Sequence, residues 1–180
     1  MMTDILFIVG SPREGSSLHA ARHMIARAES QGMDCDLLHL NYNPPPCRAC
    51  DRCKEGECYD EEVTRTNERL AKARAIVVCS PVYFGCMSAQ LKALFDRTRP
   101  LRANGRLKDC IGAAVATGRS RNGGQEMTIQ SIHAWMHIQG MVIAGDDSHF
   151  GGTLQEPASK DEYGIQTIDR TIHKVCRLIG

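Results

Sequence analysis

ILFIVGSPREGSSL, residues 5–18, places an apolar run, a turn rich in glycine and serine, and the start of a helix in immediate succession. The unbroken apolar run of residues 5–9 is typical of a strand that is buried on both faces, as the strands of parallel sheets are. Residues 17–31 follow with apolar side chains at helical spacing. A strand that passes directly into a helix predicts one repeat of an α/β fold.

The same alternation of short apolar runs and helical periodicity continues to the end of the chain. We expect strands at residues 5–9, 35–40, 75–79, 111–116 and 141–144, and helices at about 17–31, 62–71, 88–97, 124–138 and 165–179. This succession, without repeat or linker, predicts a single domain over residues 1–180. The domain is expected to be a doubly wound, five-stranded parallel sheet in the order 2-1-3-4-5 with helices on both faces.

The composition of the 180 residues excludes several classes of protein. An apolar fraction of 42% with 24% charged residues is ordinary for a soluble globular chain, and a net charge of +1 gives no reason to expect a nucleic acid or an anionic membrane as partner. No apolar run approaches the roughly 20 residues that span a bilayer, and the start of the chain lacks the features of a signal peptide. We therefore expect a cytoplasmic protein, in which the nine cysteines are reduced thiols or metal ligands rather than a disulfide framework.

The loop after the first expected strand has the composition of a phosphate-binding turn. Residues 10–17, GSPREGSS, open directly into a helix, so that backbone N–H groups, serine hydroxyls and the helix dipole can face one anion. Ser16 stands where the nucleoside-triphosphate loop has its lysine, and the dinucleotide fingerprint G-x-G-x-x-G is missing. A monophosphate group is therefore the expected ligand, although the same residues also suit an ordinary turn and helix cap.

Two further loops follow the third and fourth expected strands, at the edge where the strand order reverses. Residues 80–85, SPVYFG, contain a proline-fixed turn that can present backbone groups to a flat heterocycle. Residues 117–125, TGRSRNGGQ, contain glycines that let the main chain approach the same ligand from the other side. Tyr83 and Phe84 offer aromatic faces to it, whereas each taken singly also suits packing beneath a loop. We expect the three loops to form one ligand site.

Four cysteines stand close together in a loop at about residues 41–60. Cys47, Cys50, Cys53 and Cys58 are spaced C-x2-C-x2-C-x4-C, and small or charged residues separate them. This spacing favours an iron–sulfur cluster, because structural zinc sites usually bring together two distant C-x2-C pairs. A zinc knuckle remains the alternative.

These motifs together resemble those of the iron–sulfur flavoproteins, a group within the NAD(P)H-dependent FMN reductase branch of the flavodoxin-like fold. The resemblance rests on GSPRxGSS at 10–17, the cysteine run, and SPVYFG at 80–85 followed by MSAQLKALFDR at 87–97, and it spans roughly the first 125 residues. It implies a [4Fe-4S] cluster on the four cysteines and assembly as homodimers or homotetramers. It also implies FMN, with its phosphate on Ser11, Arg13, Ser16 and Ser17 and its ring held by Pro81, Val82, Tyr83, Phe84, Gly85, Thr117, Gly118, Arg119, Gly123 and Gly124.

A protein with both groups can join two-electron to one-electron chemistry, because FMN exchanges electrons in pairs or singly and a cluster exchanges them singly. We therefore expect an oxidoreductase that exchanges electrons with a small redox carrier such as ferredoxin or with NAD(P)H, and with a small-molecule acceptor. No side chain is assigned to catalysis, and the roles of Cys86 and of residues 145–163 stay open.

Two other functions fit the same residues. One is an NAD(P)H-dependent FMN or quinone reductase in which the cysteine loop binds a structural zinc. The other is a redox-sensing binding protein, whose cluster or flavin responds to oxidants and alters a partner interface.

Overall fold

The computed structural model describes residues 3–56 and 58–180, so that Met1, Met2 and, within the predicted cysteine loop, Glu57 lie outside the described residues. Its parallel sheet confirms the predicted order, β2-β1-β3-β4-β5, and a further strand, β6, also pairs with β4. The strands are β1 (Thr3–Val9), β2 (Cys35–His39), β3 (Ala73–Pro81), β4 (Ile111–Gly118), β5 (Val142–Ile143) and β6 (Gly152–Gln155).

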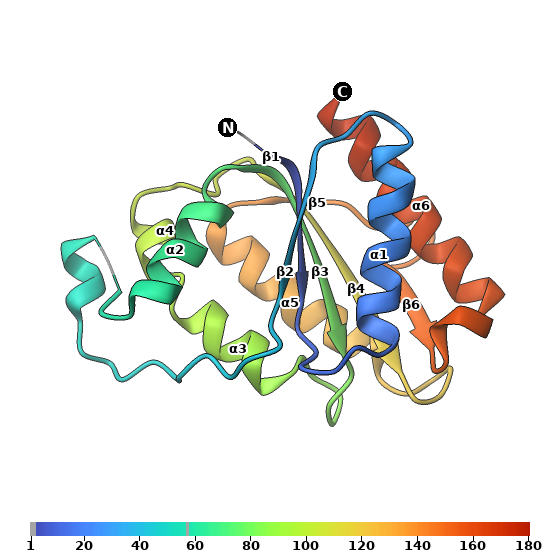
Figure 1. Cartoon of the computed structure of the whole chain (residues 1–180), viewed down its shortest axis with the longest axis horizontal. Helices are drawn as coiled ribbons and strands as arrows, with labels where there is room; N and C mark the ends of the chain where they lie inside the picture. Colours follow the sequence, from blue (N-terminus) through green and yellow to red (C-terminus); the bar gives the residue numbers. More distant parts are fainter. Residues whose placement is uncertain (1–2, 57) are drawn as a thin grey trace.

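Helices cover both faces of this sheet, as predicted (Figure 1). One face carries α1 (Ser16–Glu29) and α6 (Glu162–Ile179). The opposite face carries α2 (Glu61–Leu70), α3 (Ala89–Asp96), α4 (Arg99–Ala103) and α5 (Gln125–Gln139). The short α4 was not expected from the sequence.

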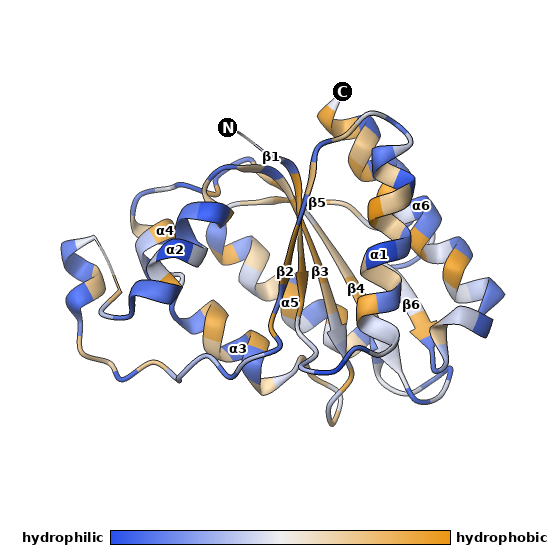
Figure 2. Cartoon of the chain, in the orientation of Figure 1, coloured by the Kyte–Doolittle hydropathy of each residue, from blue (hydrophilic) through white to orange (hydrophobic). Residues whose placement is uncertain are grey.

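Alternate residues of each central strand supply the two hydrophobic cores. In β1, Ile5, Phe7 and Val9 pack toward α1 and α6, while Leu6 and Ile8 pack toward the helices of the other face. All five side chains are essentially inaccessible to solvent, which explains why β1 is continuously apolar rather than alternating. Figure 2 shows the resulting layer of hydrophobic strands between helices whose outer surfaces are hydrophilic.

The fifth strand position differs from the prediction of one strand at residues 141–144. Only Val142 and Ile143 pair there, and the chain then leaves the sheet and returns as β6, which pairs with β4 from Val115 to Gly118. The return requires glycine. A Cβ at Gly151 would lie 2.2 Å from the Ala114 carbonyl oxygen, and one at Gly152 would lie 2.5 Å from Ile168. Residues 144–151 thus form an excursion between two strands on the same edge of β4.

The carboxyl ends of β1, β3, β4 and β6 point to one edge of the sheet (Figure 1). The cysteine loop leaves β2 at this edge and runs outward beyond the helix layer of α2, α3 and α4. Among the described residues, no helix is long and apolar enough to cross a membrane.

Candidate functional site

The three predicted ligand loops meet at the carboxyl edge of the sheet. The hydroxyls of Ser17, at the start of α1, and of Thr117, at the end of β4, lie 2.6 Å apart and are buried. The backbone N–H of Val82, just after β3, donates to the Thr117 carbonyl (2.9 Å). Thr117 therefore holds the loops after β1 and β3 against the end of β4.

The loop after β1 leaves the start of α1 open to an anion. Gly15 is the N-cap and provides no capping side chain, and the first turn carries no acidic residue. Ser11 is buried and turns the loop by accepting a hydrogen bond from the Arg13 N–H (3.2 Å), which leaves the Arg13 side chain exposed. The His39 ring donates to the Ser11 carbonyl (2.8 Å) and ties this loop to the end of β2. Ser16, by contrast, accepts from the Ala158 N–H (3.2 Å).

The loop after β3 is a tight turn with an exposed aromatic tip. Tyr83 and Cys86 exchange two backbone hydrogen bonds, and the two residues between them both have positive φ, as in a type I′ turn. Phe84, at φ 51°, is fully exposed, and Tyr83 is exposed at 37%. A bulky residue rarely adopts positive φ, so this conformation marks the turn as a candidate ligand contact. Neither Tyr83 nor Phe84 is packed in the core beneath the loop.

The loop after β4 lies directly against this turn. A Cβ at Gly124, where φ is +99°, would come within 3.2 Å of the Gly85 Cα, so the two loops touch through their backbones. Gln125 shapes the loop from inside, since its side chain accepts from the Gly123 N–H (2.9 Å) and donates to the Ser120 (2.6 Å) and Leu154 (3.1 Å) carbonyls. Gln125 was not among the predicted site residues.

The four cysteines of the loop after β2 line one small cavity of about 60 Å³. The loop backbone is sharply bent around them, with positive φ at Ala49 and Asp51 and a 3-10 turn at Arg52–Glu55. Within residues 3–56 and 58–180, no three His, Cys, Asp or Glu side chains are grouped as a single metal ion would require. The four cysteines are nevertheless brought together as lining residues of one cavity.

Arg97, at the end of α3, is the buried cation of this cavity. Its guanidinium donates to the Cys58 sulfur (3.3 and 3.1 Å) and to the Pro45 carbonyl (2.9 Å), and it stacks 4.7 Å from the centre of the Tyr59 ring. Burial opposes its charge, but the hydrogen bond to Cys58 and the electrostatic attraction of Cys58, Tyr59 and Asp60 together outweigh this cost and raise the pKa of Arg97 above its ordinary value. A cation therefore stays beside Cys58.

Arg99 approaches the cavity from α4. Its Nη1 donates to Asp51 (2.9 Å) and lies 3.5 Å from the Cys53 sulfur, but half of the side chain is exposed. Neither arginine was predicted from the sequence. Both arginines lie in the segment FDRTR, residues 95–99, whose pattern indicates only a helix. Nothing in that pattern shows that Arg97 contacts Cys58, which lies 39 residues earlier in the chain.

Comparison with known sequences finds a matching family model and similar proteins. The sequence model of one family, described as NADPH-dependent FMN reductase, matches residues 3–153. An iron-sulfur flavoprotein of Methanosarcina thermophila is 44% identical over 96% of this chain and 93% of the relative. An iron-sulfur flavoprotein of Methanocaldococcus jannaschii is 38% identical over 97% of this chain and 96% of the relative.

Comparison with solved structures concerns the fold. A WrbA-like flavodoxin from Agrobacterium tumefaciens superposes with a TM-score of 0.75 over 98% of this chain and 97% of its own, at 15% sequence identity. The shared architecture is the flavodoxin-like parallel sheet with helices on both faces.

The buried contacts of Arg97 predict that it anchors the cysteine loop more strongly than Arg99 does. Arg97→Gln should lower the free energy of unfolding by about 1–3 kcal/mol, because it leaves buried acceptors without a donor. Arg99→Gln should change it by less than about 1 kcal/mol, since exposed ion pairs contribute little. Urea unfolding of the full chain measures both, and equal effects of the two substitutions would contradict this role of Arg97.

Proposed function

Since this chain belongs to the NADPH-dependent FMN reductase family and is an FMN-dependent oxidoreductase, we propose that it transfers electrons between FMN and a [4Fe-4S] cluster. The observation that carries the proposal is the placement of two separate candidate sites on one fold: three converging loops at the carboxyl edge of the sheet, and four thiols around one cavity beyond it. We further propose that residues 1–180 act as one domain.

The loop after β1 suits the phosphate of FMN. The uncapped start of α1 presents backbone N–H groups at the positive end of a helix of 14 residues, and no carboxylate in its first turn repels an anion. We assign the phosphate to Ser11, Arg13, Ser16 and Ser17. The exposed Arg13 supplies a positive charge, and the hydroxyls lie along the same turn.

The turn after β3 and the loop after β4 suit the flavin ring. We assign the ring to Pro81, Val82, Tyr83, Phe84, Gly85, Thr117, Gly118, Arg119, Gly123 and Gly124. Backbone contact between Gly85 and Gly124 leaves main-chain groups, rather than bulky side chains, as the nearest donors and acceptors. The exposed faces of Tyr83 and Phe84 are available to an aromatic ligand.

The cysteine loop suits a cluster. Thiols that line one cavity can bind the separate irons of one cluster, and their C-x2-C-x2-C-x4-C spacing favours a cluster over a structural zinc. We assign Cys47, Cys50, Cys53 and Cys58 as its ligands. The buried Arg97 beside Cys58 supports this, because a cation that donates to a sulfur offsets the negative charge of thiolates.

FMN exchanges electrons as pairs or singly, and the cluster exchanges single electrons. We propose that a ferredoxin-like carrier or NAD(P)H is the donor, that a small molecule is the acceptor, and that the protein works in the cytoplasm as a homodimer or homotetramer. The protein's own contribution is to hold both groups and to donate hydrogen bonds to them.

Analysis of iron, acid-labile sulfide, zinc and FMN tests this function on protein purified without oxygen. We expect about four irons, four sulfides and one FMN per chain. One zinc with FMN and no sulfide would instead support a two-electron reductase with a structural metal. Low turnover with every donor, together with oxidation-dependent assembly, would support a redox sensor.

Replacement of one thiol should separate the two sites. Cys50→Ala is expected to lose the iron and sulfide while it retains FMN, because the cavity and the flavin loops share no residue. Cys35→Ala, on β2 and outside the cavity, is the matched control and should retain both. Loss of FMN from a folded Cys50→Ala protein would count against separable sites.

A methyl group at Gly124 should weaken FMN binding. Gly124→Ala places a side chain at φ +99° and 3.2 Å from Gly85, so the two ring loops must move apart. A cost of about 1–3 kcal/mol corresponds to a Kd increase of roughly 5-fold to 150-fold in a fluorescence titration. Gly105→Ala is the control, because Gly105 also has a positive φ, +61°, but open space around the added methyl. Equal affinities for the two variants would show that the ring lies elsewhere.

A further inference from the structure

The excursion that interrupts the fifth strand carries a buried carboxylate. Asp146 has no exposed surface, and it accepts hydrogen bonds from the backbone N–H groups of Ser148 (3.0 Å) and His149. Arg170 of α6 donates to the same carboxylate (3.3 Å). Burial alone would raise the pKa of Asp146, but the His149 ring and the backbone N–H groups of Ser148 and His149 lower it below the ordinary value, so that the group stays ionised.

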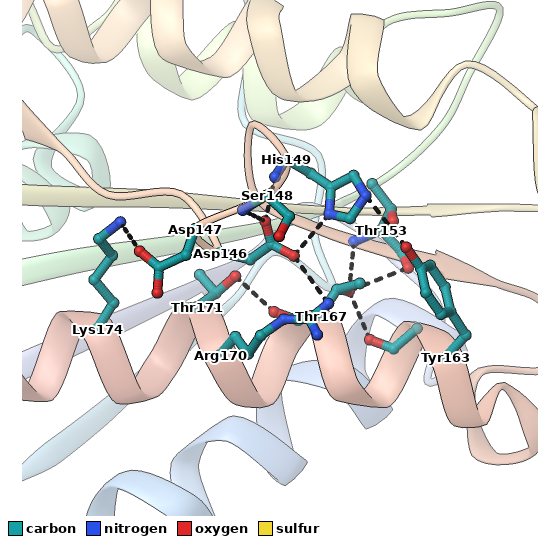
Figure 3. A network of polar contacts seen from close by, with 11 residues as sticks. Asp146, Asp147, Ser148, His149, Thr153, Tyr163, Thr167, Arg170, Thr171 and Lys174 are labelled. Atoms are coloured by element: carbon teal, nitrogen blue, oxygen red, sulfur yellow. Dashed lines mark hydrogen bonds and ion pairs between the residues drawn. The ribbon is translucent and has the colours of Figure 1, made fainter.

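This carboxylate orients a histidine, and the histidine contacts a tyrosine. Nδ1 of His149 lies 2.8 Å from Asp146, and its Nε2 lies 3.2 Å from the Tyr163 hydroxyl at the start of α6 (Figure 3). An ionised carboxylate can only accept, so Nδ1 carries the proton and Nε2 accepts from Tyr163. Asp146, His149 and Tyr163 therefore form a directed chain of hydrogen bonds that runs from the interior to the surface.

The outer end of the chain opens on a pocket beside the flavin loops. The pocket has a volume of about 410 Å³, and its wall includes His149, Tyr163, Gly124, Gln125 and Arg121. Gly124 is the residue whose backbone touches Gly85 of the proposed ring site. The pocket and the proposed flavin site thus share Gly124 as a common part of their walls.

The pocket wall is rich in hydrogen-bond donors. Arg121 lies 5.3 Å above the Tyr163 ring; its Nη2 is paired with Asp161, and its buried Nη1 has no hydrogen-bond partner among the described residues. Asn122 adds an amide, and Glu126 is the single acidic residue of the wall. This balance favours a ligand with an oxygen that accepts hydrogen bonds.

We propose that Asp146, His149 and Tyr163 form a proton relay into this pocket, where a small acceptor with a carbonyl-type oxygen is reduced. The inference rests on the proposed FMN site, which supplies the electrons next to the shared wall. Tyr163 is the residue that contacts the acceptor, and His149 and Asp146 are positioning residues behind it.

The step balances in electrons and protons. Conversion of the acceptor's carbonyl system to a hydroxyl form takes two electrons and two protons; reduced FMN held in the proposed site would supply both electrons and one of the protons. The second proton comes from Tyr163. His149 first takes a proton from solvent on Nε2, and Asp146 stabilises the resulting positive charge. The O–H bond of Tyr163 then breaks as its proton passes to the acceptor oxygen. The Nε2–H breaks in turn and returns a proton to the phenol, which leaves a neutral imidazole.

The first test needs no flavin. Nitrogen-15 NMR of histidine-labelled protein should show His149 in the Nδ1-protonated tautomer at neutral pH, and Asp146→Asn should abolish this preference. His173, exposed on α6, serves as the control through His173→Gln, which should leave the His149 signals unchanged. The Nε2-protonated tautomer in the unaltered protein would overturn the relay.

The second test separates proton-coupled from proton-free electron transfer. In the anaerobic holoprotein with reduced FMN, Tyr163→Phe should slow reoxidation by tetramethyl-p-benzoquinone about tenfold or more and leave reoxidation by ferricyanide unchanged. The substitution retains the ring beside Arg121 and removes only the hydroxyl. Tyr42→Phe, the same deletion just after β2, should alter neither rate.

The outcomes distinguish the relay from the function on which it rests. Bound FMN with equal slowing of both acceptors, or of neither, would overturn the relay and leave the proposed function intact. A chain that binds no FMN would overturn the proposed function, and the relay would then lack its source of electrons.

Discussion

Strand β1 pairs in parallel with β2 on one side and with β3 on the other, and every other element takes its place from this double pairing. A parallel neighbour requires a crossover, so each strand must be followed by a segment that returns over a face of the sheet. Both faces are then covered, and the loops after the strands must all emerge at one edge. Segments as distant in sequence as Ser17 and Thr117 come into hydrogen-bond contact because of this constraint.

The cysteine loop depends on a second kind of contact, made by side chains at its two ends. Asp60 caps α2 at the end of the loop by accepting from the Glu62 and Val63 N–H groups, and Thr64 donates to the Cys58 carbonyl. Arg97 joins the start of the loop at Pro45 to its end at Cys58. The buried guanidinium of Arg97 therefore stabilises a loop that is too polar to form a hydrophobic core of its own.

The central strands could be predicted from the sequence because each is an apolar run that is buried on both faces. Strand β6 could not, because GTLQ contains one large buried side chain, Leu154, and its pairing depends on space that Gly151 and Gly152 leave for their neighbours. The grouping of the cysteines around one cavity was predictable from their local spacing. Arg97 and the pair His149 and Tyr163 were not, because their contacts join residues of different elements that only the fold brings together.

The excursion between β5 and β6 has a thermodynamic consequence of its own. Both of its ends are fixed on β4, so its residues close a loop whose entropic cost grows only with the logarithm of its length, by about 0.6 kcal/mol for each doubling. Neither the register of β4 nor the packing of α6 on β6 requires a particular number of residues between Ala144 and Gly152. Insertions that leave the buried contacts of Asp146 and the close approach of Gly151 to Ala114 intact should therefore cost the fold little, and the shape of the neighbouring pocket can vary while the sheet is unchanged.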